Sequence, residues 1–443
     1  MVATPFPIPI PSDSPFGLYN IPFGIFSTSA GIGVGARPRA GVAIGDFVLE
    51  LHELAKHGVF SDVNEGLGGS GRLERIFLEP VLNSFAALPA DERRRIRVTI
   101  ISNISSPKSP LFTLAELNEN GFVGINDVQM HVPMKITDYT DSFSSLIHAE
   151  NSLHPLGLSL PPAFTEYPMG YNGRLSSIRP SGTAVRRPCG FYLNEGDSRP
   201  AYQPTRQLDF EIELGAFISR PVEHGCTIDA KAAADYIFGY VLHNDWSARD
   251  IQKYEMPPLG PLHSKGFITT ISPWVVTPDA LESSKAGPPA SNSTRIHPAL
   301  VADEKDHGVY DIEFTATVMR DGDDTGPVDI VRSNFAHSYW SIPQMIAYQS
   351  SAGHGLNVGD LVASGTISSP VADVKRGLGT YGCLLESIAQ KHELPEVGGK
   401  PLSWLEDGDR FSFEGWFRTE DGKRGGFGGV TSLVLPARPS WPQ

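Results

Sequence analysis

The sequence predicts a mostly β protein of the α+β class, built from two domains. Its 443 residues exceed the length of one small domain, and the 40% that are hydrophobic can form a sizeable core. Glycine (45 residues) and proline (37 residues) interrupt short apolar alternations along the whole chain. This punctuation favours short strands and tight turns over long helices. A change of texture near residue 125 divides the chain into domains 1–125 and 126–443.

The first domain opens with a proline-rich lead and continues as short alternations that predict small antiparallel strands. One helix is expected over ADERRRIRVTII, and its charged run is interpreted as a solvated face. The stretch GIGVGA resembles a nucleotide-binding glycine loop, but such a loop should lie between a strand and a helix. Here RPRAGVAIGD follows, which predicts a turn and another strand. Catalytic residue types do not cluster in this domain, so we interpret it as a structural module.

The second domain alternates predicted strands with Gly-Pro turns, and only a few short helices are expected. Pro, Ser and Ala dominate TPDALESSKAGPPASNSTRIHPALVADEK, which predicts a surface loop. The Asp-Gly and Gly-Pro pairs of MRDGDDTGPVD predict the end of a hairpin.

Charge and composition exclude several classes of protein. A net charge of −14 without a basic stripe argues against nucleic acid or an anionic membrane as partner. The N-terminus lacks a signal-peptide pattern, and no stretch reaches the ~20 apolar residues of a membrane span. The cysteines Cys189, Cys226 and Cys383 are widely spaced, so we expect reduced thiols in a cytoplasmic protein rather than disulfides or a zinc site.

The stretch QLDFEIELGAF, residues 207–217, predicts a strand with an unusual acidic face. With a period of two, Phe210, Ile212 and Leu214 lie on one side and three carboxylates on the other, from Asp209, Glu211 and Glu213. The strand is either a solvent-facing edge or a ligand for a hard divalent cation such as Ca²⁺ or Mg²⁺, which prefers oxygen donors. Burial of these carboxylates would demand a positive partner.

Two further acids each precede a predicted helix. Asp141 opens SFSSLIH, and His148 lies seven residues on, so the two share a helical face. They are either an N-cap and an ordinary histidine, or a metal ligand beside a base. In HNDWSARDIQK a helix from Asp245 would align Arg249 and Gln252 with it. That alignment is either an exposed ion pair or a converging polar site.

Three other polar residues carry little signal when each is taken alone. Lys265 lies in PPLGPLHSKGF, where prolines and a glycine stiffen the approach to it. Thr366 in SGTISS and Glu386 in GCLLES are ordinary. They become candidate site residues only in combination with the acidic segments.

Together these segments resemble the fumarylacetoacetase family of carbon–carbon hydrolases. The resemblance covers nearly the whole chain, and its most specific parts are LDFEIELGAF with NDWSARDIQKYE; others are DYTD, GYNGR, KGFITTISPWVV and GDLVASGTIS. It implies a small N-terminal SH3-like barrel followed by a β-roll domain, in a homodimer. It also implies a small-molecule diketone substrate and a bound Ca²⁺ or Mg²⁺.

The resemblance also implies roles for particular residues. The metal ligands of the family match Asp141, Glu211, Glu213 and Asp245, with Lys265 and Thr269 beside the metal. The general base matches His148 and the acid that orients it matches Glu386; the groups that stabilise the oxyanion match Arg249, Gln252 and Lys265. Substrate contacts match Tyr171, Gln252 and Thr366. These roles describe metal-dependent hydrolysis of a 1,3-diketone by a water that His148 activates.

Three departures from the family pattern concern the substrate pocket. Phe143 and Met256 stand where the family has tyrosines, and HAENSLHPLGLSLPP is shorter and offers no arginine. These changes predict a substrate more apolar than fumarylacetoacetate, such as another acylpyruvate or diketone. Two other functions stay open: a β-keto acid decarboxylase or isomerase on the same scaffold, and a non-catalytic metal-binding scaffold.

Overall fold

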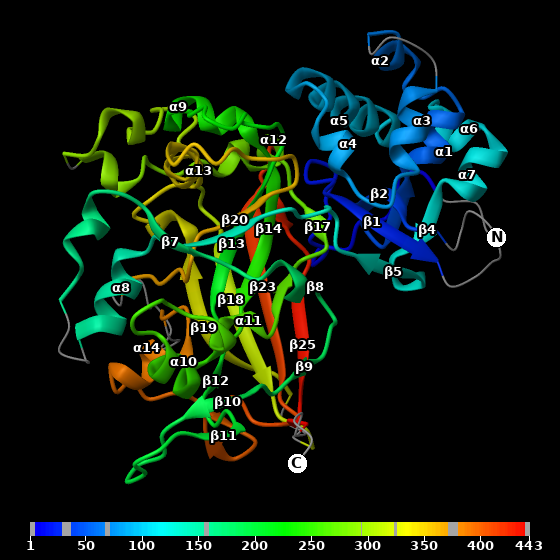
Figure 1. The fold of residues 1–443 in the computed structure, drawn as a ribbon. Helices are drawn as coiled ribbons and strands as arrows, with labels where there is room; N and C mark the ends of the chain where they lie inside the picture. The colour runs from blue at the N-terminus through cyan, green and yellow to red at the C-terminus, as the bar shows by residue number, and fades with distance from the viewer. Residues whose placement is uncertain are drawn as a thin grey trace.

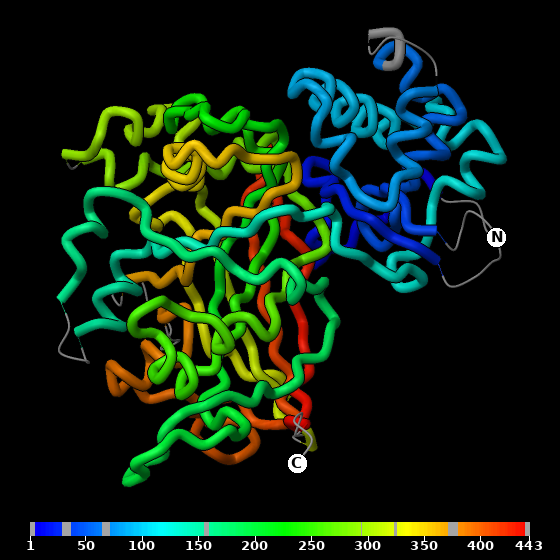
Figure 2. The backbone as a smooth tube through the Cα atoms, in the orientation of Figure 1, coloured from blue at the N-terminus to red at the C-terminus, as the bar shows by residue number. Residues whose placement is uncertain are grey.

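The structure, a computed structural model, has an N-terminal module beside a larger β-rich body (Figure 1). It describes residues 5–28, 37–66, 71–154, 159–293, 295–322, 326–370 and 380–438. Figure 2 shows the N-terminal segment, blue to cyan, as a distinct mass next to the rest of the chain. The fold is therefore mixed α+β, as predicted.

The N-terminal module is built on an antiparallel six-stranded sheet among the described residues. Its path is β17-β1-β2-β3-β4, with β5 also paired to β1. The strands are β1 (Phe23–Thr28), β2 (Arg39–Ile44), β3 (Phe47–Glu50), β4 (Phe122–Gly124), β5 (Val128–His131) and β17 (Trp274–Val275). The predicted strands of this module are confirmed, including the one within RPRAGVAIGD. The SH3-like barrel and the boundary at residue 125 stay predictions, and GIGVGA lies outside the described residues.

Between β3 and β4 the module is helical, which the sequence reading largely missed. The helices are α1 (Leu51–Lys56), α2 (Ser61–Gly66), α3 (Arg72–Phe77), α4 (Asn83–Ala86), α5 (Ala90–Ile104), α6 (Pro110–Thr113) and α7 (Ala115–Asn120). Only α5 was expected, because the others are too short to show a clear 3.6-residue period. The charged run of α5 is not wholly solvated: Arg97 is buried and donates hydrogen bonds to the carbonyls of Tyr19 and Asn20.

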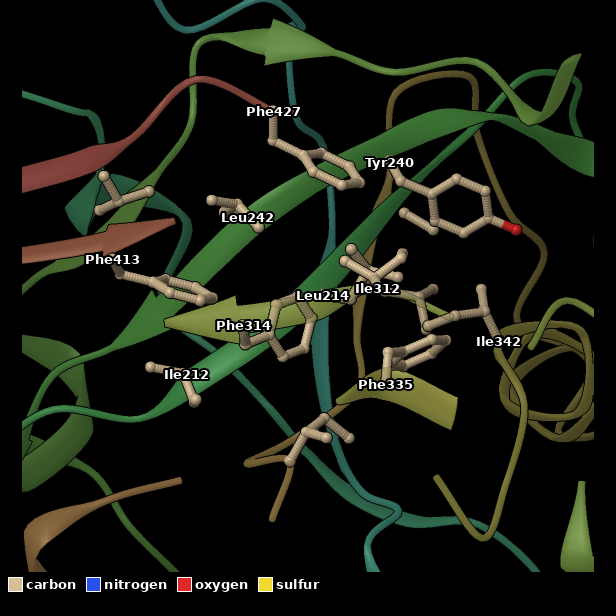
Figure 3. Close-up of a cluster of buried hydrophobic side chains, with 14 of the residues drawn as sticks. Ile212, Leu214, Tyr240, Leu242, Ile312, Phe314, Phe335, Ile342, Phe413 and Phe427 are labelled. Carbon is tan, nitrogen blue, oxygen red and sulfur yellow. The ribbon is translucent and has the colours of Figure 1, made fainter. Parts of the chain in front are cut away.

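The body contains two large sheets that enclose the main core. A seven-stranded sheet has the order β7-β6-β20-β13-β14-β16-β8, and a six-stranded sheet runs β19-β18-β23-β25-β9 with β24 beside β23, counting the described residues. Leu214, Leu242, Phe314 and Phe413 meet between them (Figure 3). The strands of the first sheet are β6 (Tyr139–Phe143), β7 (Met169–Asn172), β8 (Ile178–Pro180), β13 (Ile212–Ile218), β14 (Ile237–Asp245), β16 (Thr269–Ile271) and β20 (Leu361–Ala363).

The second large sheet and three small ones complete the strands. The second sheet consists of β9 (Val185–Arg186), β18 (Glu313–Met319), β19 (Val328–Asn334), β23 (Arg410–Arg418), β24 (Arg424–Gly426) and β25 (Val430–Leu435). The antiparallel pair β18 and β19 confirms the predicted hairpin. The small pairs are β10 (Cys189–Tyr192) with β11 (Ala201–Pro204), β12 (Leu208–Asp209) with β15 (Ser247–Ala248), and β21 (Glu396–Val397) with β22 (Lys400–Pro401).

Short helices cover the ends of these sheets. They are α8 (Leu146–Leu153), α9 (Ala230–Ala233), α10 (Arg249–Glu255), α11 (His263–Gly266), α12 (Pro278–Leu281), α13 (Ile342–Ser351) and α14 (Leu384–Ala389). The predicted loop after residue 276 contains α12 and three turns of 3₁₀ helix, η7 (Glu282–Ser284), η8 (Ala290–Ser293) and η9 (Pro298–Leu300). All three cysteines are free thiols, as expected. Among the described helices, none combines the length and apolar character that crossing a membrane requires.

Gly365 offers a test of the backbone that follows β20. Its φ is +74°, and an added Cβ would lie 2.0 Å from the carbonyl oxygen of Ser142 on β6. We expect Gly365→Ala to lower the free energy of unfolding by about 1 kcal/mol through backbone strain, plus about 1–3 kcal/mol through the clash. Gly182→Ala is the control, because φ is +89° there but nothing lies within 4 Å. Equal melting temperatures for the two variants would contradict this geometry.

Candidate active site

The acidic residues gather on one face of the seven-stranded sheet because the pleat separates them from the core. On β13, Leu214 points into the main core, so Glu213 points to the opposite face. On β14, Leu242 likewise faces the core, and His243 and Asp245 face the other way. Glu213 and His243 are directly paired across the two strands. Asp141 reaches the same face from β6.

The predicted acidic strand is divided into two strands, although apolar and acidic side chains still alternate along it. The predicted strand over 207–217 is split into β12 and β13 at Phe210 and Glu211. The cause is local: the N–H of Glu211 donates to the side-chain oxygen of Asn244 at 3.0 Å, outside the strand ladder. Asp209, Glu211 and Glu213 are all buried, which rules out a solvent-facing edge.

Two predicted helix starts are wrong. Asp141 lies within β6, where it pairs with Tyr171 on one side and Ala363 on the other. Asp245 ends β14 and pairs with Thr269. Pairing within the sheet outweighs the local preference of aspartate for a helix N-terminus. The helices begin later: Ser145 caps α8 by accepting the N–H of His148, and α10 starts at Arg249.

The carboxylates are only partly satisfied by neighbouring side chains. Tyr139 donates to Oδ2 of Asp141 at 3.1 Å, and Tyr171 donates to Oδ2 of Asp245 at 2.6 Å. Lys265 Nζ also lies 2.8 Å from Oδ2 of Asp245. Among the described residues, no hydrogen-bond donor reaches four carboxylate oxygens of this cluster, namely Asp141 Oδ1, Asp245 Oδ1 and both oxygens of Glu213.

Charge crowding shifts the titration of these acids in opposite directions. Burial, then the neighbouring carboxylates, raise the pKa of Asp141 and of Glu213 well above their usual values. Burial alone would also raise the pKa of Glu211, but Lys265 and Arg249 outweigh it and hold that pKa far below its usual range.

The donor set fits a divalent cation. Ligand atoms of Glu211, Glu213 and Asp245 lie within 4.8 Å of one another, as do those of Asp141, Glu213 and His243. Both oxygens of Glu211 already contact cations, because Arg249 Nη2 lies 2.8 Å from Oε1 and Lys265 Nζ lies 2.5 Å from Oε2. The carboxylate oxygens that remain available to bind a cation are therefore those of Asp141, Glu213 and Asp245. A bound cation would compensate the negative charge of buried carboxylate oxygens that accept no hydrogen bond.

A buried histidine–carboxylate pair lies beside the cluster. His148 Nδ1 is 2.7 Å from Glu386 Oε1, and the two side chains are 7% and 0% exposed. Asn151 and Ser368 also donate to Glu386, at 3.0 Å and at 2.7 and 2.9 Å. Sequence analysis paired His148 with Glu386 but missed both of these donors. Asn151 carried one usable signal, since it lies one helical turn after His148 on α8.

Polar donors form the opposite side of the site. Arg249 donates through Nη1 to the Gln252 side-chain oxygen at 3.0 Å, and through Nε to Oδ2 of Asp209 at 2.8 Å. Asp209 further accepts the backbone N–H groups of Leu384 and Leu385, just before Glu386. Thr366 is buried, and its hydroxyl has no hydrogen-bond partner within the described part of the chain. The link from Asp209 to Arg249 was missed, because the two lie 40 residues apart in different segments.

A cavity adjoins this site at Tyr171 and Lys265. It has a volume of about 390 Å³, and Tyr171 and Lys265 lie in its wall together with Arg174, Pro261 and Leu262. The contacts above connect most of the predicted site residues, which come from separate segments of the chain, and Thr269 on β16 is paired with Asp245. Met256, at the end of α10, is 43% exposed.

Known proteins are similar to this sequence along most of its length. A fumarylacetoacetase N-terminal model matches residues 19–133, and a fumarylacetoacetate (FAA) hydrolase C-terminal model matches residues 147–434. Fumarylacetoacetases of Arabidopsis thaliana and Homo sapiens are 38% and 37% identical to the chain; the first match covers 98% of both chains, the second 97% of this chain and 98% of the human one. A crystal structure from Mycobacterium smegmatis, described as an HpcE protein, is 16% identical with a TM-score of 0.51 and shares the fold over 94% of this chain and 99% of its own.

Fold, site and relatives together define the class of protein as a hydrolase that acts on carbon–carbon bonds. Within that class, the chain belongs to the fumarylacetoacetase family. Its two-domain organisation is that of the family.

The Asp209–Arg249 pair gives a test of the site's scaffold. We expect Asp209→Asn to lower the free energy of unfolding by about 3 kcal/mol, because a buried guanidinium loses a charged partner. Asp279→Asn is the matched control: its ion pair with Arg94 is exposed and contributes at most about 1 kcal/mol. Thermal unfolding in the presence of a chelator measures both. A melting temperature for Asp209→Asn equal to that of the control would contradict a structural role for this pair.

Proposed function

We propose that the protein hydrolyses the carbon–carbon bond between the two carbonyls of a fumarylacetoacetate-type 1,3-diketone. The observation that carries this proposal is the buried 2.7 Å contact of His148 with Glu386, next to a cluster of unpaired carboxylate oxygens. An oriented imidazole serves to activate water, which decarboxylation does not need. The names of the curated relatives support the same reaction.

The cation is proposed to be divalent, Ca²⁺ or Mg²⁺, held by Asp141, Glu213 and Asp245 with Glu211 as a further ligand. Unpaired oxygens of Asp141, Glu213 and Asp245 support this assignment, as does the position of Glu213, which lies within 4.8 Å of ligand atoms of each of the other three acids. When bound, such an ion supplies Lewis acidity toward the diketone oxygens. Lys265 and Thr269 are proposed to lie next to it.

His148 is proposed as the general base. With its proton on Nδ1, shared with Glu386, the imidazole presents the lone pair of Nε2. That nitrogen can take a proton from a water molecule, and Glu386 stabilises the imidazolium that forms. The pKa of Glu386 supports this role: burial would raise it, but His148 and the hydrogen bonds from Ser368 and Asn151 outweigh burial and lower it.

Arg249, Gln252 and Lys265 are proposed to stabilise the oxyanion that forms when hydroxide attacks the carbonyl. Gln252 accepts a hydrogen bond from Arg249 through its oxygen, which leaves the amide N–H₂ free to donate. Lys265 uses two of its three protons on Glu211 and Asp245 and keeps one for the substrate. Tyr171 and Thr366 are proposed as further substrate contacts. Donors fixed in a buried site stabilise developing charge more strongly than water does.

The substrate is proposed to be more apolar than fumarylacetoacetate itself. Phe143 packs edge-on against the His148 ring, with ring centroids 5.4 Å apart, so an apolar ring lines the site beside the base. Met256 adds no hydroxyl either. The segment expected to carry the missing arginine falls partly on residues 155–158, outside the described part of the chain. An acylpyruvate or 1,3-diketone without a second carboxylate fits this lining.

Several finer features of the family stay predictions for this chain: a homodimer, a cytoplasmic location, the SH3-like form of the N-terminal module, and a place in tyrosine and phenylalanine breakdown. The β-keto acid decarboxylase or isomerase and the non-catalytic scaffold have no observation in their favour.

Replacing His148 by alanine tests the proposed base. We expect kcat to fall by about 10²–10⁴-fold, because water then lacks a positioned proton acceptor. Calorimetric affinity for the cation and the melting temperature should stay close to those of the wild type. His154→Ala is the control, since this exposed histidine ends the same helix. Turnover by His148→Ala at the wild-type rate would exclude His148 as the base.

A substrate panel tests the reaction and the pocket separately. Fumarylacetoacetate, apolar acylpyruvates and simple 1,3-diketones are incubated with the purified enzyme, with and without chelator, and products are identified by mass spectrometry. We expect two fragments from each substrate that turns over, loss of turnover with chelator, and a higher kcat/KM for the apolar compounds. Release of CO₂ would contradict hydrolysis, whereas efficient cleavage of fumarylacetoacetate would contradict only the apolar pocket.

A further inference from the structure

His243 is a fully buried histidine to which the proposed mechanism gives no role. It lies on β14, two residues before Asp245, and its Cα is paired with that of Glu213 on β13. Its ring packs against Tyr139, with ring centroids 5.4 Å apart. The period of the strand directs it to the acidic face of the sheet rather than to the main core. Its neighbours there include the carboxylates of Glu213 and Asp141.

Both ring nitrogens of His243 lack a hydrogen-bond partner in the described structure. Nδ1 lies 2.9 Å from Oε2 of Glu213, but the direction of the N–H does not satisfy hydrogen-bond geometry, and both oxygens of Glu213 are themselves without a donor. Buried polar atoms are normally paired. A neutral imidazole always offers one nitrogen lone pair. With the proton on Nε2, the lone pair of Nδ1 lies next to the Glu213 carboxylate, which is itself an electron-pair donor.

The unpaired atoms share one small volume. A ring nitrogen of His243, a carboxylate oxygen of Glu213 and a carboxylate oxygen of Asp141 all lie within 4.8 Å of one another. Asp141 Oδ1 is also without a donor, because Tyr139 occupies Oδ2. Three groups that each carry an unpaired acceptor atom lie close together without a hydrogen bond between them. They are the arrangement that a cation between them would satisfy.

We propose that His243 is a nitrogen ligand of the cation site, together with Asp141 and Glu213. This inference deepens the proposed function and rests on its cation site, whose expected ligands are oxygens alone. An imidazole changes the chemistry of that site: Ca²⁺ and Mg²⁺ prefer oxygen donors, whereas first-row transition-metal ions bind mixed sets of imidazole and carboxylate. With His243 as a ligand, the site should bind Mn²⁺, Co²⁺ or Zn²⁺ more tightly than an oxygen-only set would, while Ca²⁺ and Mg²⁺ still bind through the carboxylates.

Direct detection of the nitrogen ligand tests the assignment without relying on activity. The full-length protein is freed of metal with a chelator and loaded with Mn²⁺, and pulsed electron paramagnetic resonance measures coupling of the ion to ¹⁴N. We expect ¹⁴N coupling in the wild type and in His148→Gln, and its loss in His243→Gln, whose amide offers an oxygen instead. Coupling that is absent in the wild type, or that persists in His243→Gln, would overturn the proposal.

Affinity gives a second, independent measurement. Calorimetric titrations with Co²⁺ and Ca²⁺ compare the wild type with His243→Gln, and melting curves of the metal-free proteins check folding. We expect Co²⁺ affinity to fall at least about tenfold in the variant while Ca²⁺ affinity changes little. Equal losses for both ions would overturn the nitrogen assignment. If the variant does not fold, the wild-type ¹⁴N spectrum decides. Failure of the wild type to bind any divalent ion would instead remove the cation site itself.

Discussion

The excess of buried negative charge on one face of the seven-stranded sheet constrains everything around it. Asp141, Glu213 and Asp245 are buried on this face, and the buried Asp209 and Glu211 precede β13. Among the described residues, the buried cations Arg249 and Lys265 contact three of these five carboxylates, those of Asp209, Glu211 and Asp245. Such an excess is costly in an interior unless something positive or a proton offsets it. The same excess explains why the tyrosine hydroxyls, the lysine and the arginine all point inward.

One face of strands β13 and β14 packs in the main core, and the other face carries residues of the polar site. One face contributes Leu214 and Leu242 to the main core, and that packing fixes where Glu213 and His243 point on the other face. A slip of one residue in the pairing of β13 with β14 would exchange the two sets, so the hydrophobic core specifies the geometry of the polar site. Asp209 adds a second constraint, since it holds Arg249 and the backbone at the start of α14 together.

Sequence reasoning reached the parts of the site that have a short-range pattern. Alternation in LDFEIELGAF predicted the acidic face, whereas local helix-capping preference placed Asp141 and Asp245 wrongly, because strand pairing over long sequence distances decides their backbone. His243 could not be found from the sequence alone, since a single histidine in an apolar strand is usually an ordinary core residue. The short helices between β3 and β4 escaped for a related reason: tertiary packing of Leu51, Leu54 and their neighbours, rather than a long periodic pattern, holds them.

The strand β17 follows β16 after a gap of only two residues, yet it pairs with β1 of the N-terminal module. A hydrophobic cluster also crosses the junction, where Phe85 of α4 meets Phe238 of β14. Excision of the first 125 residues would thus uncover a sheet edge and an apolar surface next to the strands that carry Asp245 and Thr269. The N-terminal module thus covers part of the catalytic domain, and the shared strand pairing and apolar contacts favour unfolding of the two parts together.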